Sequence, residues 1–369
     1  MFKNIECKRG KRKSKTFFEG DMGALILCYH HIKDGERIDP ETFENHLKIL
    51  KKQDFCPVKL KDIYDFIKGK KDLPKRSVHL TFDDGYVDNF IYAYPLLKQY
   101  GFFGTIFVIT SKLNEENLRR PLSSEIREME FSMKEVHTFI KDKQFMSWRE
   151  VEEMQKSGLI EIESHSHYHR ACFSSAKIVK FNNGNVGGWF YETAKDRRLG
   201  IPVYTKRWRL SADCMEDDKG LRDYLAEFVS ENGGILFFKK SNAFRILRRR
   251  VKEYKRKFNF RFTKMDVDRF SSCLRELKLS KDMIEERLNK KCEFLAYPWG
   301  NYDNLVIRAL KQLNFLGGLT LNVGLNAPKT DLFLMRRVEA RGKNWLKKRL
   351  NIYKSGLLSE IYSKVHHKI

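Results

Sequence analysis

Two adjacent carboxylates and three closely spaced histidines are the residues of this 369-residue chain whose types and spacing could do chemistry. Asp83 and Asp84 end an apolar run, and His165, His167 and His169 follow another one. Imidazole and carboxylate groups bind Zn²⁺ and similar borderline ions, and two histidines with one aspartate leave coordination positions open, as in catalytic metal sites. The pattern therefore indicates a catalytic metal centre, in which one carboxylate binds the ion and the other acts as a base.

Each motif also has a purely structural interpretation. Asp83-Asp84 followed by Gly85 is typical of a turn, or of a helix N-cap at which a carboxylate accepts backbone N–H groups. A solvated, histidine-rich loop is the structural alternative for residues 165–169. The separate motifs leave these alternatives open.

The elements that must position these side chains alternate along the chain. Apolar runs predict strands at residues 24–29, 77–82, 104–110, 159–162, 293–296 and 317–321. Helical spacing of apolar residues predicts helices at 43–52, 60–67, 89–100, 148–156, 270–288 and 305–313. This alternation predicts parallel β/α units with helices outside the sheet, and functional groups in such folds lie at the C-terminal ends of strands. The aspartate pair, the histidines and Tyr297-Pro298-Trp299 all fall there.

Three motifs resemble those of the polysaccharide deacetylase family, the NodB-homology class of carbohydrate esterases. They are Thr81-Phe82-Asp83-Asp84-Gly85, His165-Ser166-x-x-His169 and Tyr297-Pro298-Trp299-Gly300, of which the third resembles a subset with a Tyr-Pro-x-Gly motif. The resemblance covers roughly residues 23–171 and 266–340. It implies an α/β fold, a deformed (β/α) barrel with parallel strands, and metal-dependent removal of an N-acetyl group from an amino sugar of a surface polysaccharide or its precursor.

The resemblance implies a role for each residue that matches the first two motifs. Asp83 becomes the general base. Asp84, His165 and His169 become the ligands of one divalent ion, for which Zn²⁺ is the expected metal while other divalent ions stay open. His167 is then a neighbour of the site and not a ligand.

Four further residues are expected to bind substrate: Tyr297, Trp299, His30 and Arg337. In the family, the backbone N–H after the motif proline, here that of Trp299, holds the oxyanion. The Trp299 indole would stack on a sugar ring or pack in the core. His30, at the end of the first strand, would face the cavity or have a structural role.

The chain departs from the family pattern at two places. Ala296 stands where many members have an arginine that orients the base, and Arg336 or Arg337, which resemble a late arginine of the subset, would substitute for it. The late Leu-x-His motif, whose histidine acts as general acid, is not evident. The proton donor to the leaving amine is therefore not assigned by the motifs.

Three regions outside the barrel motifs are predicted to be additions: a basic N-terminal tail at 1–22, an insertion at 172–265 and a basic C-terminal helix at 341–369. Within the insertion, Phe244, Leu247, Val251, Tyr254 and Phe258 mark one apolar helix face at 242–258, and arginine and lysine populate the rest. A second basic helix is predicted at 344–362. Both helices would be solvated faces or would meet an anionic membrane surface.

Composition limits the classes of function. Lys and Arg number 72 against 48 Asp and Glu, so the net charge of +24 predicts an anionic partner. No apolar run approaches the ~20 residues of a membrane span, and no secretory cleavage site is recognised. The seven irregularly spaced cysteines predict reduced thiols. We therefore expect a cytoplasmic protein, peripheral to the inner face of the membrane.

The sequence favours a metal-dependent deacetylase for an N-acetylated glycan or a lipid- or nucleotide-linked sugar. Two alternatives stay open: a hydrolase for a formyl or O-acetyl group, and a catalytically silent barrel that binds glycans or polyanions. Nucleic acid is not expected as a partner, because no recognised binding module is present.

Overall fold

The computed structural model of the chain describes residues 23–128, 144–194 and 196–365. They form two compact units. Unit 1 comprises the described residues of Met1–Tyr168, Leu274–Gly300 and Ile307–Ile369, and unit 2 those of His169–Cys273 and Asn301–Val306. The predicted tail at 1–22 lies outside the described residues.

Unit 1 is built on an eight-stranded sheet of order β11-β10-β5-β4-β3-β1-β12, with β2 paired to β3. Its strands are β1 (Leu25–Tyr29), β2 (Cys56–Pro57), β3 (Ser77–Asp84), β4 (Gly104–Val108), β5 (Ile160–Ser164), β10 (Phe294–Ala296), β11 (Gly317–Leu319) and β12 (Val338–Glu339). All of these pairings are parallel. A parallel bridge joins Leu319 of β11, at one edge of the sheet, to Met335. Met335 lies just before β12, which is the other edge of the sheet. The sheet is therefore curled, and the predicted deformed (β/α) barrel is confirmed.

The central strands are buried on both faces because helices and loops cover them. All five residues of β1 and all eight of β3 are buried, although β3 carries polar residues at alternate positions. Burial on both faces is typical of parallel sheets, and each large apolar side chain buried in the core contributes about 1.5–3 kcal/mol. The Tyr29 ring packs edge-on against Phe43 and is stacked against Phe82, which fixes the first strand against its neighbours.

A buried carboxylate joins β5 to β10, where the ladder is short. Glu163 accepts hydrogen bonds from the backbone N–H groups of Glu293 and Phe294, both at 2.8 Å, and from Lys290 Nζ at 2.7 Å. The side chain thereby supplies acceptors that a longer strand pairing would provide. This brings the start of β10, and with it the Tyr297 motif, beside the histidine strand.

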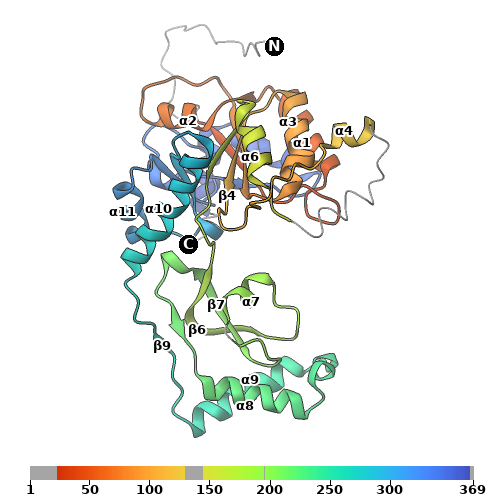
Figure 1. Ribbon diagram of the computed structural model, residues 1–369, viewed down its shortest axis with the longest axis vertical. Coiled ribbons are helices and arrows are strands. Elements are labelled where there is room, and N and C mark those ends of the chain that lie inside the picture. The colour runs from red at the N-terminus through yellow and green to blue at the C-terminus, as the bar shows by residue number, and fades with distance from the viewer. Residues whose placement is uncertain (1–22, 129–143, 195, 366–369) are drawn as a thin grey trace. The chain divides into compact units, whose positions relative to one another are not determined.

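Helices surround the sheet of unit 1 (Figure 1). They are α1 (Pro40–Lys52), α2 (Leu60–Ile67), a π turn at Asn89–Ala93 that continues into α3 (Tyr94–Tyr100), α4 (Ser123–Glu128), α6 (Trp148–Lys156), α10 (Arg269–Leu288) and α11 (Asn304–Gln312). Local sequence explains where several begin: Asp39 accepts the Thr42 N–H at the start of α1, and Ser147 with Glu150 forms a capping box at α6.

Unit 2 contains the segment predicted as an insertion. Its elements are β6 (Ala171–Phe181), α7 (Gly188–Thr193), β7 (Pro202–Trp208), a 3₁₀ turn at Arg209–Ser211, β8 (Met215–Glu216), α8 (Lys219–Glu231), a 3₁₀ turn at Gly234–Lys239, α9 (Ala243–Lys257) and β9 (Thr263–Lys264). The strands pair antiparallel as β6-β7 and β8-β9, and none of them joins the eight-stranded sheet. Strands were not predicted in this segment.

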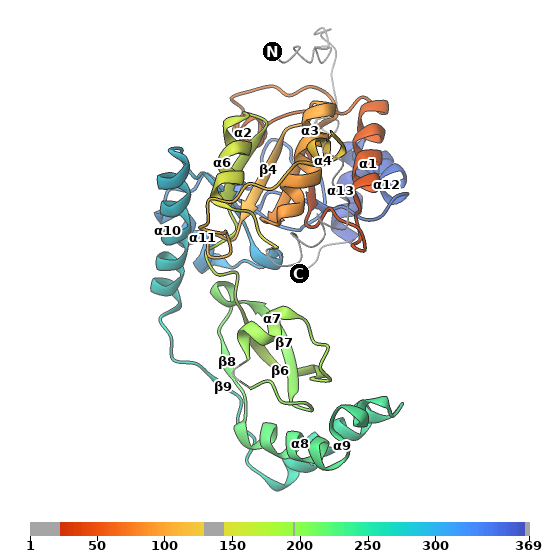
Figure 2. The same ribbon diagram turned by 45° about the vertical axis from the view of Figure 1, so that its right-hand side comes forward.

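Helices α8 and α9 lie side by side in both views and share an apolar core (Figures 1 and 2). Leu247, Val251 and Tyr254 of α9 are buried, as their helical spacing predicts. The two outer members of the predicted face, Phe244 and Phe258, are 39% and 53% exposed. Phe244 still packs against Phe181 and Phe238, and Phe258 against Tyr254, so the outer positions of this face also take part in packing.

The C-terminal segment forms two helices, α12 (Trp345–Tyr353) and α13 (Gly356–Val365), in place of the single predicted helix (Figure 2). Helix α12 buries Leu346, Leu350 and Tyr353. Helix α13 is turned the other way: its serines are buried, and its large apolar residues Leu357, Leu358, Ile361 and Val365 are exposed. None of the helices in the described part of the chain reaches both the length and the hydropathy that crossing a bilayer requires.

Five cysteines in the described part of the chain are free: Cys28, Cys172, Cys214, Cys273 and Cys292. Cys56 is disulfide-bonded. The expectation of reduced thiols is therefore wrong for Cys56.

Candidate metal centre and catalytic site

The predicted ligands meet at one edge of the sheet because of the register of three parallel strands. Asp84 of β3 is opposite Val108 of β4, which is opposite Ser164 of β5, and His165 comes directly after Ser164. The carboxyl ends of β3 and β5 therefore reach the same level. Side chains 81 positions apart in sequence are brought together by this alignment.

Asp84, His165 and His169 form a group whose ligand atoms all lie within 4.8 Å of one another. Asp84 and His165 are buried and His169 is half-buried. His167 is outside this group, since its Nδ1 is 2.8 Å from Thr110 Oγ1. The structure thus brings together the three side chains that were predicted to bind a metal.

The protonation of His165 shows why this group suits a cation. Nδ1 is 2.9 Å from the carbonyl oxygen of Ala296, so Nδ1 carries the proton and donates it. Burial lowers the pKa of His165. The neutral ring then presents the Nε2 lone pair to Asp84 Oδ1 at 3.5 Å. Two acceptors in this arrangement repel each other unless a cation lies between them, and a backbone carbonyl on the other ring nitrogen is the usual partner of a metal-binding histidine.

Left-handed backbone angles turn the ligands into the site. φ is 78° at Asp84, 67° at Ser166, 52° at His169 and 53° at Trp299. Non-glycine residues in this region cost on the order of 1–3 kcal/mol each and cluster at functional sites. On a regular strand Asp83 and Asp84 would point to opposite faces, whereas here both carboxylates approach His165 Nε2, at 4.0 and 3.5 Å.

Glycine is required after this aspartate pair. Gly85 has φ of 82°, and a Cβ there would lie 3.2 Å from Val108 Cγ1. Any larger residue would combine backbone strain with a close contact against β4.

Asp83 is held by a buried guanidinium. Arg337 Nη1 donates to Asp83 Oδ1 at 2.6 Å and Nη2 donates to Oδ2 at 2.8 Å, and the two side chains are 0% and 2% exposed. Burial raises the pKa of Asp83, but the charges of Arg337, His165 and His30 and the Arg337 hydrogen bonds together outweigh burial and hold the pKa of this carboxyl well below its usual range. Asp83 is therefore ionised at neutral pH and has one fixed orientation.

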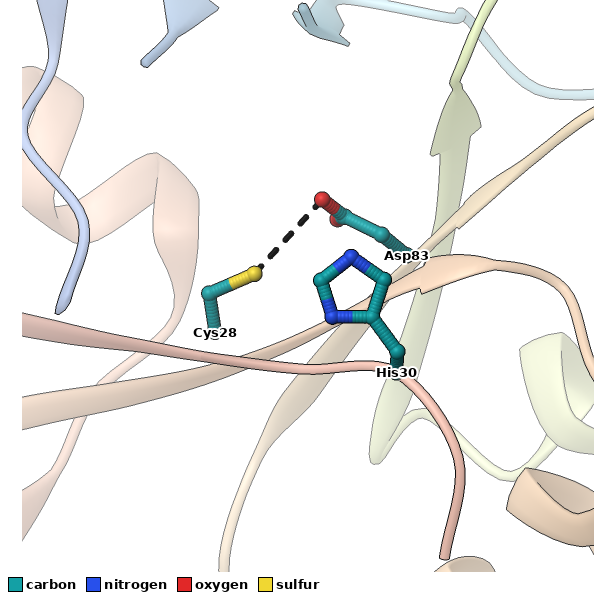
Figure 3. Close-up of side chains that lie close together, drawn as sticks. All are labelled: Cys28, His30 and Asp83. Atoms are coloured by element: carbon teal, nitrogen blue, oxygen red, sulfur yellow. Dashed lines mark hydrogen bonds between the residues drawn. The ribbon is translucent and has the colours of Figure 1, made fainter. Parts of the chain in front are cut away.

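Two more groups flank the Asp83 carboxylate (Figure 3). The Cys28 thiol donates to Oδ2 at 3.5 Å, and Cys28, His30 and Asp83 have ligand atoms within 4.8 Å of one another. His30 is half-buried, and its backbone carbonyl accepts a hydrogen bond from Asn89 Nδ2 at 2.8 Å. An imidazole thus lies beside the carboxylate at the end of β1.

The structure places the predicted substrate-binding residues differently from one another. Tyr297 is fully buried and its hydroxyl donates to the Phe333 carbonyl at 2.9 Å, so it joins the end of β10 to the Phe333 segment. Arg337 is also fully buried and contacts Asp83. Trp299 and His30 are half-buried. Burial leaves only Trp299 and His30 of the four with surface for a substrate, and the expectation of substrate contact does not fit Tyr297 and Arg337.

Cys28 and Tyr86 are parts of the site that sequence reasoning missed. The Tyr86 hydroxyl hydrogen-bonds to Asp84, and burial followed by the Asp84 charge holds the pKa of Tyr86 well above its usual range. The Tyr86 ring is stacked against His31, with 3.5 Å between ring centroids. Its position directly after Gly85 is a signal that could have identified it. Cys28 gives no such signal, because it reads as one more apolar residue of a buried strand.

The sequence is similar to those of known polysaccharide deacetylases. The family described as polysaccharide deacetylase matches residues 70–185. The chain is 34% identical over 223 residues to the poly-beta-1,6-N-acetyl-D-glucosamine N-deacetylase of Staphylococcus aureus, which is 54% of this chain and 66% of that protein. It is 36% identical over 94 residues to YxkH of Bacillus subtilis, which is 25% of this chain and 34% of that protein. The chain thus spans one third to just under two thirds of these relatives.

Solved structures share the fold at low sequence identity. IcaB from Ammonifex degensii aligns with a TM-score of 0.54 and 18% identity over 89% of this chain and 96% of that one. The deacetylase PplD of Streptococcus pyogenes aligns with a TM-score of 0.51 and 17% identity over 90% of this chain and 98% of that one. These similarities support the barrel fold of unit 1.

Proposed function

Because residues 70–185 match the polysaccharide deacetylase family and the chain is similar to a known N-deacetylase, we propose that it hydrolyses the N-acetyl group of an amino sugar in a polysaccharide or its precursor. The observation that carries the proposal is the buried Asp83–Arg337 pair directly beside the group of Asp84, His165 and His169. A fixed, ionised base next to a cation site is what amide hydrolysis by activated water needs.

Asp84, His165 and His169 would hold one divalent ion, for which Zn²⁺ fits the ligand set of two imidazoles and one carboxylate. A bound ion of this kind polarises the acetyl carbonyl and lowers the pKa of water. Tyr86 would keep Asp84 in place through its hydroxyl, and the Ala296 carbonyl would keep the His165 ring in the correct tautomer.

Asp83 would take the proton from the attacking water, because its carboxylate is ionised and oriented by Arg337. The water oxygen adds to the acetyl carbon, and the C–N bond then breaks to give acetate and the free amine. The Trp299 N–H, in the tight left-handed turn after Pro298, would donate to the developing oxyanion.

His30 is proposed as the donor of the proton that the leaving amine needs. The family's late histidine is not evident here, and the His30 imidazole lies within 4.8 Å of the base on a half-buried position. Strand β1, which leads into His30, pairs with β3 on the side away from β5. His30 would therefore donate its proton to a substrate nitrogen on that side of Asp83. This assignment gives the acid and the base of the reaction to the ends of two adjacent strands, β1 and β3.

The proposed substrate is a β-linked N-acetylglucosamine polymer or its lipid- or nucleotide-linked precursor, because the name of the Staphylococcus aureus relative gives such a polymer. The half-buried Trp299 would stack on a sugar ring. Release of acetate should be measured on oligomers of N-acetylglucosamine, on nucleotide- and lipid-linked N-acetyl sugars, and on N-formyl and O-acetyl analogues. If no N-acetyl sugar releases acetate but the N-formyl or O-acetyl analogues are hydrolysed, the protein is a hydrolase for one of those acyl groups and the proposal is wrong. No turnover of any compound would favour a silent, glycan-binding barrel.

We also propose that the protein meets anionic membrane surfaces. Seven cationic side chains of α9 are exposed: Arg245, Arg248, Arg249, Lys252, Lys255, Arg256 and Lys257. Lysines at 347, 348, 354 and 364 are exposed on α12 and around α13, whose apolar side chains also face outward. This combination of charge and apolar surface is typical of peripheral binding to acidic lipids.

A further inference from the structure

Cys28, His30 and Asp83 form a second group of potential metal ligands. In the proposed reaction, two of them, His30 and Asp83, act as the proton donor and the base. Cys28 and His30 stand at the end of β1, which is paired with β3 so that Cys28 is opposite Thr81 and Tyr29 is opposite Phe82. The thiol, the imidazole and the Asp83 carboxylate converge on one point (Figure 3), with ligand atoms within 4.8 Å of one another. The two-strand pairing holds this geometry.

The spacing of these atoms fits a tetrahedral ion that binds sulfur. Cys28 Sγ and Asp83 Oδ2 are 3.5 Å apart. An ion about 2.3 Å from a thiolate sulfur and about 2.0 Å from a carboxylate oxygen, in tetrahedral geometry, separates those two atoms by about 3.5 Å. Sulfur, nitrogen and oxygen together are the ligand set of zinc and of softer divalent ions. We propose that Cys28, His30 and Asp83 bind a second, thiophilic divalent ion, and that this ion inhibits the enzyme.

The charges at this position explain why the second ion would bind after the first. Cys28 is a fully buried thiol in the free protein, and its S–H donates to Asp83 Oδ2. Binding replaces the thiol proton: the S–H bond breaks, the proton leaves to solvent, and a sulfur–metal bond forms. The thiolate offsets one of the two positive charges of the ion, but Arg337 stays nearby and repels it. The affinity is therefore lower than at the Asp84 group, and the site fills only when metal is in excess.

The Arg337 contact does not block the site. Each carboxylate oxygen has two lone pairs. Arg337 Nη2 occupies one lone pair of Oδ2, and the Cys28 thiol proton occupies the other, which is the position that the ion would take. The ion thus exchanges with a proton and leaves the buried ion pair intact.

Inhibition is the part of this inference that rests on the proposed function. An ion held by His30 and Asp83 occupies the proposed proton donor and the proposed base at once. General acid–base groups contribute typically ~10²–10⁴-fold to turnover. Saturating this site should therefore lower turnover by about 10²-fold or more, although the first ion stays bound.

Cadmium is the probe, because its bond to a thiolate gives an ultraviolet charge-transfer band that the first ligand group, with no sulfur, cannot give. The starting protein carries Cys172→Ser and Cys214→Ser, since these two thiols also lie next to each other. One equivalent of Zn²⁺ is loaded first, and Cd²⁺ is then titrated while the band, the bound metal and acetate release are measured. Cys28→Ser is compared with Cys292→Ser, which removes a thiol that is equally buried.

The starting protein and its Cys292→Ser variant should bind a further equivalent of Cd²⁺ with the band, and each should lose turnover relative to its own zinc-loaded value. Cys28→Ser should show no band and no loss. His30→Ala keeps the thiol and should weaken cadmium binding by about tenfold or more. A band that persists in Cys28→Ser, or cadmium binding that is unchanged in His30→Ala, would overturn the site. A band that depends on Cys28 in a protein that deacetylates nothing would support the site and remove the proposed function.

Discussion

Arg337 and Asp83, separated by 254 positions in the chain, form a buried two-pronged ion pair with nitrogen–oxygen distances of 2.6 and 2.8 Å. The pair exists because β12, which begins at Val338, lies beside β1, and β1 lies beside β3. The arginine that many family members carry before the motif proline is Ala296 here, and Arg337 reaches the same carboxylate from the opposite end of the sheet. The carboxylate proposed as the base is thus oriented from a different strand.

Replacement of Arg337 should destabilise the protein and lower its activity. Arg337→Met leaves the Asp83 charge buried without its partner, which costs about 3–5 kcal/mol of the free energy of unfolding. Arg336→Met is the matched control, since Arg336 pairs with Glu360 at a partly exposed position and such pairs contribute about 1 kcal/mol or less. Denaturant unfolding of both variants measures the difference. Equal stabilities would contradict the importance of the buried pair.

Loss of a histidine ligand should remove the metal. His165→Ala and His169→Ala should each abolish stoichiometric binding of a divalent ion and acetate release, because each leaves only two of the three proposed ligands. His167→Ala should keep the metal, since His167 bonds to Thr110 and lies outside the ligand group. Elemental analysis of the purified variants decides the matter. Full occupancy in both ligand variants would end the assignment.

Asp83→Asn should separate metal binding from catalysis. The amide has the shape of the carboxylate but accepts no proton from water, so turnover should fall by ~10²–10⁴-fold while bound metal stays at one equivalent. Metal content and acetate release are measured on the same preparation. If turnover stays near the wild-type value, another group is the base.

The stability of the fold should fall as pH is lowered from about 6.5 to about 4, partly because of His79. Burial lowers the pKa of His79 from 6.5 to about 4, and its ring nitrogens bond to the Val58 carbonyl and to Thr105 Oγ1. Between these two pH values the unfolded chain binds a proton that the folded protein does not, so stability rises with pH in this window by up to about 1.4 kcal/mol per pH unit.

The share of His79 in this pH dependence can be isolated. Thermal or denaturant unfolding of wild type and His79→Gln should be compared across the same window. The variant should have lower stability at pH 7 and a shallower slope between pH 6.5 and 4. An unchanged slope would mean that His79 does not titrate as its burial requires.

Charge reversal on α9 should weaken binding to acidic vesicles. Arg245→Glu, Arg248→Glu and Lys252→Glu together remove three cations that contribute about 1 kcal/mol each near an anionic surface, so affinity should fall by about 100-fold or more. A control with Lys51→Glu, Lys52→Glu and Lys98→Glu has the same net charge at exposed positions of unit 1. Co-sedimentation at low and high salt compares the two. Equal loss in both variants would show that only net charge matters, and binding to neutral vesicles would remove the electrostatic proposal.

Local sequence by itself determined most elements of unit 1 and the identity of the proposed ligands. The predicted helix at 43–52 is the last ten residues of α1, and its start at Pro40 follows from the Asp39 cap. Asp84 and His165 could be placed together in advance because parallel strands bring their carboxyl ends to one edge of a sheet. These are periodic or motif signals within a few residues, which a sequence displays directly.

Only the tertiary structure decided which side chains surround the base and which face the substrate. Arg337 reaches Asp83 because the sheet curls until β12 meets β1, and no local pattern encodes that closure. Tyr297 is buried by the approach of the Phe333 segment, so a motif residue expected at the substrate became part of the core. Cys28 looks apolar in the sequence and becomes a polar neighbour of Asp83 only through the β1–β3 register. In each case the deciding contact joins residues far apart in the chain. Such a contact forms only when the packed fold brings the two residues together, and the spacing of residues along the sequence carries no information about it.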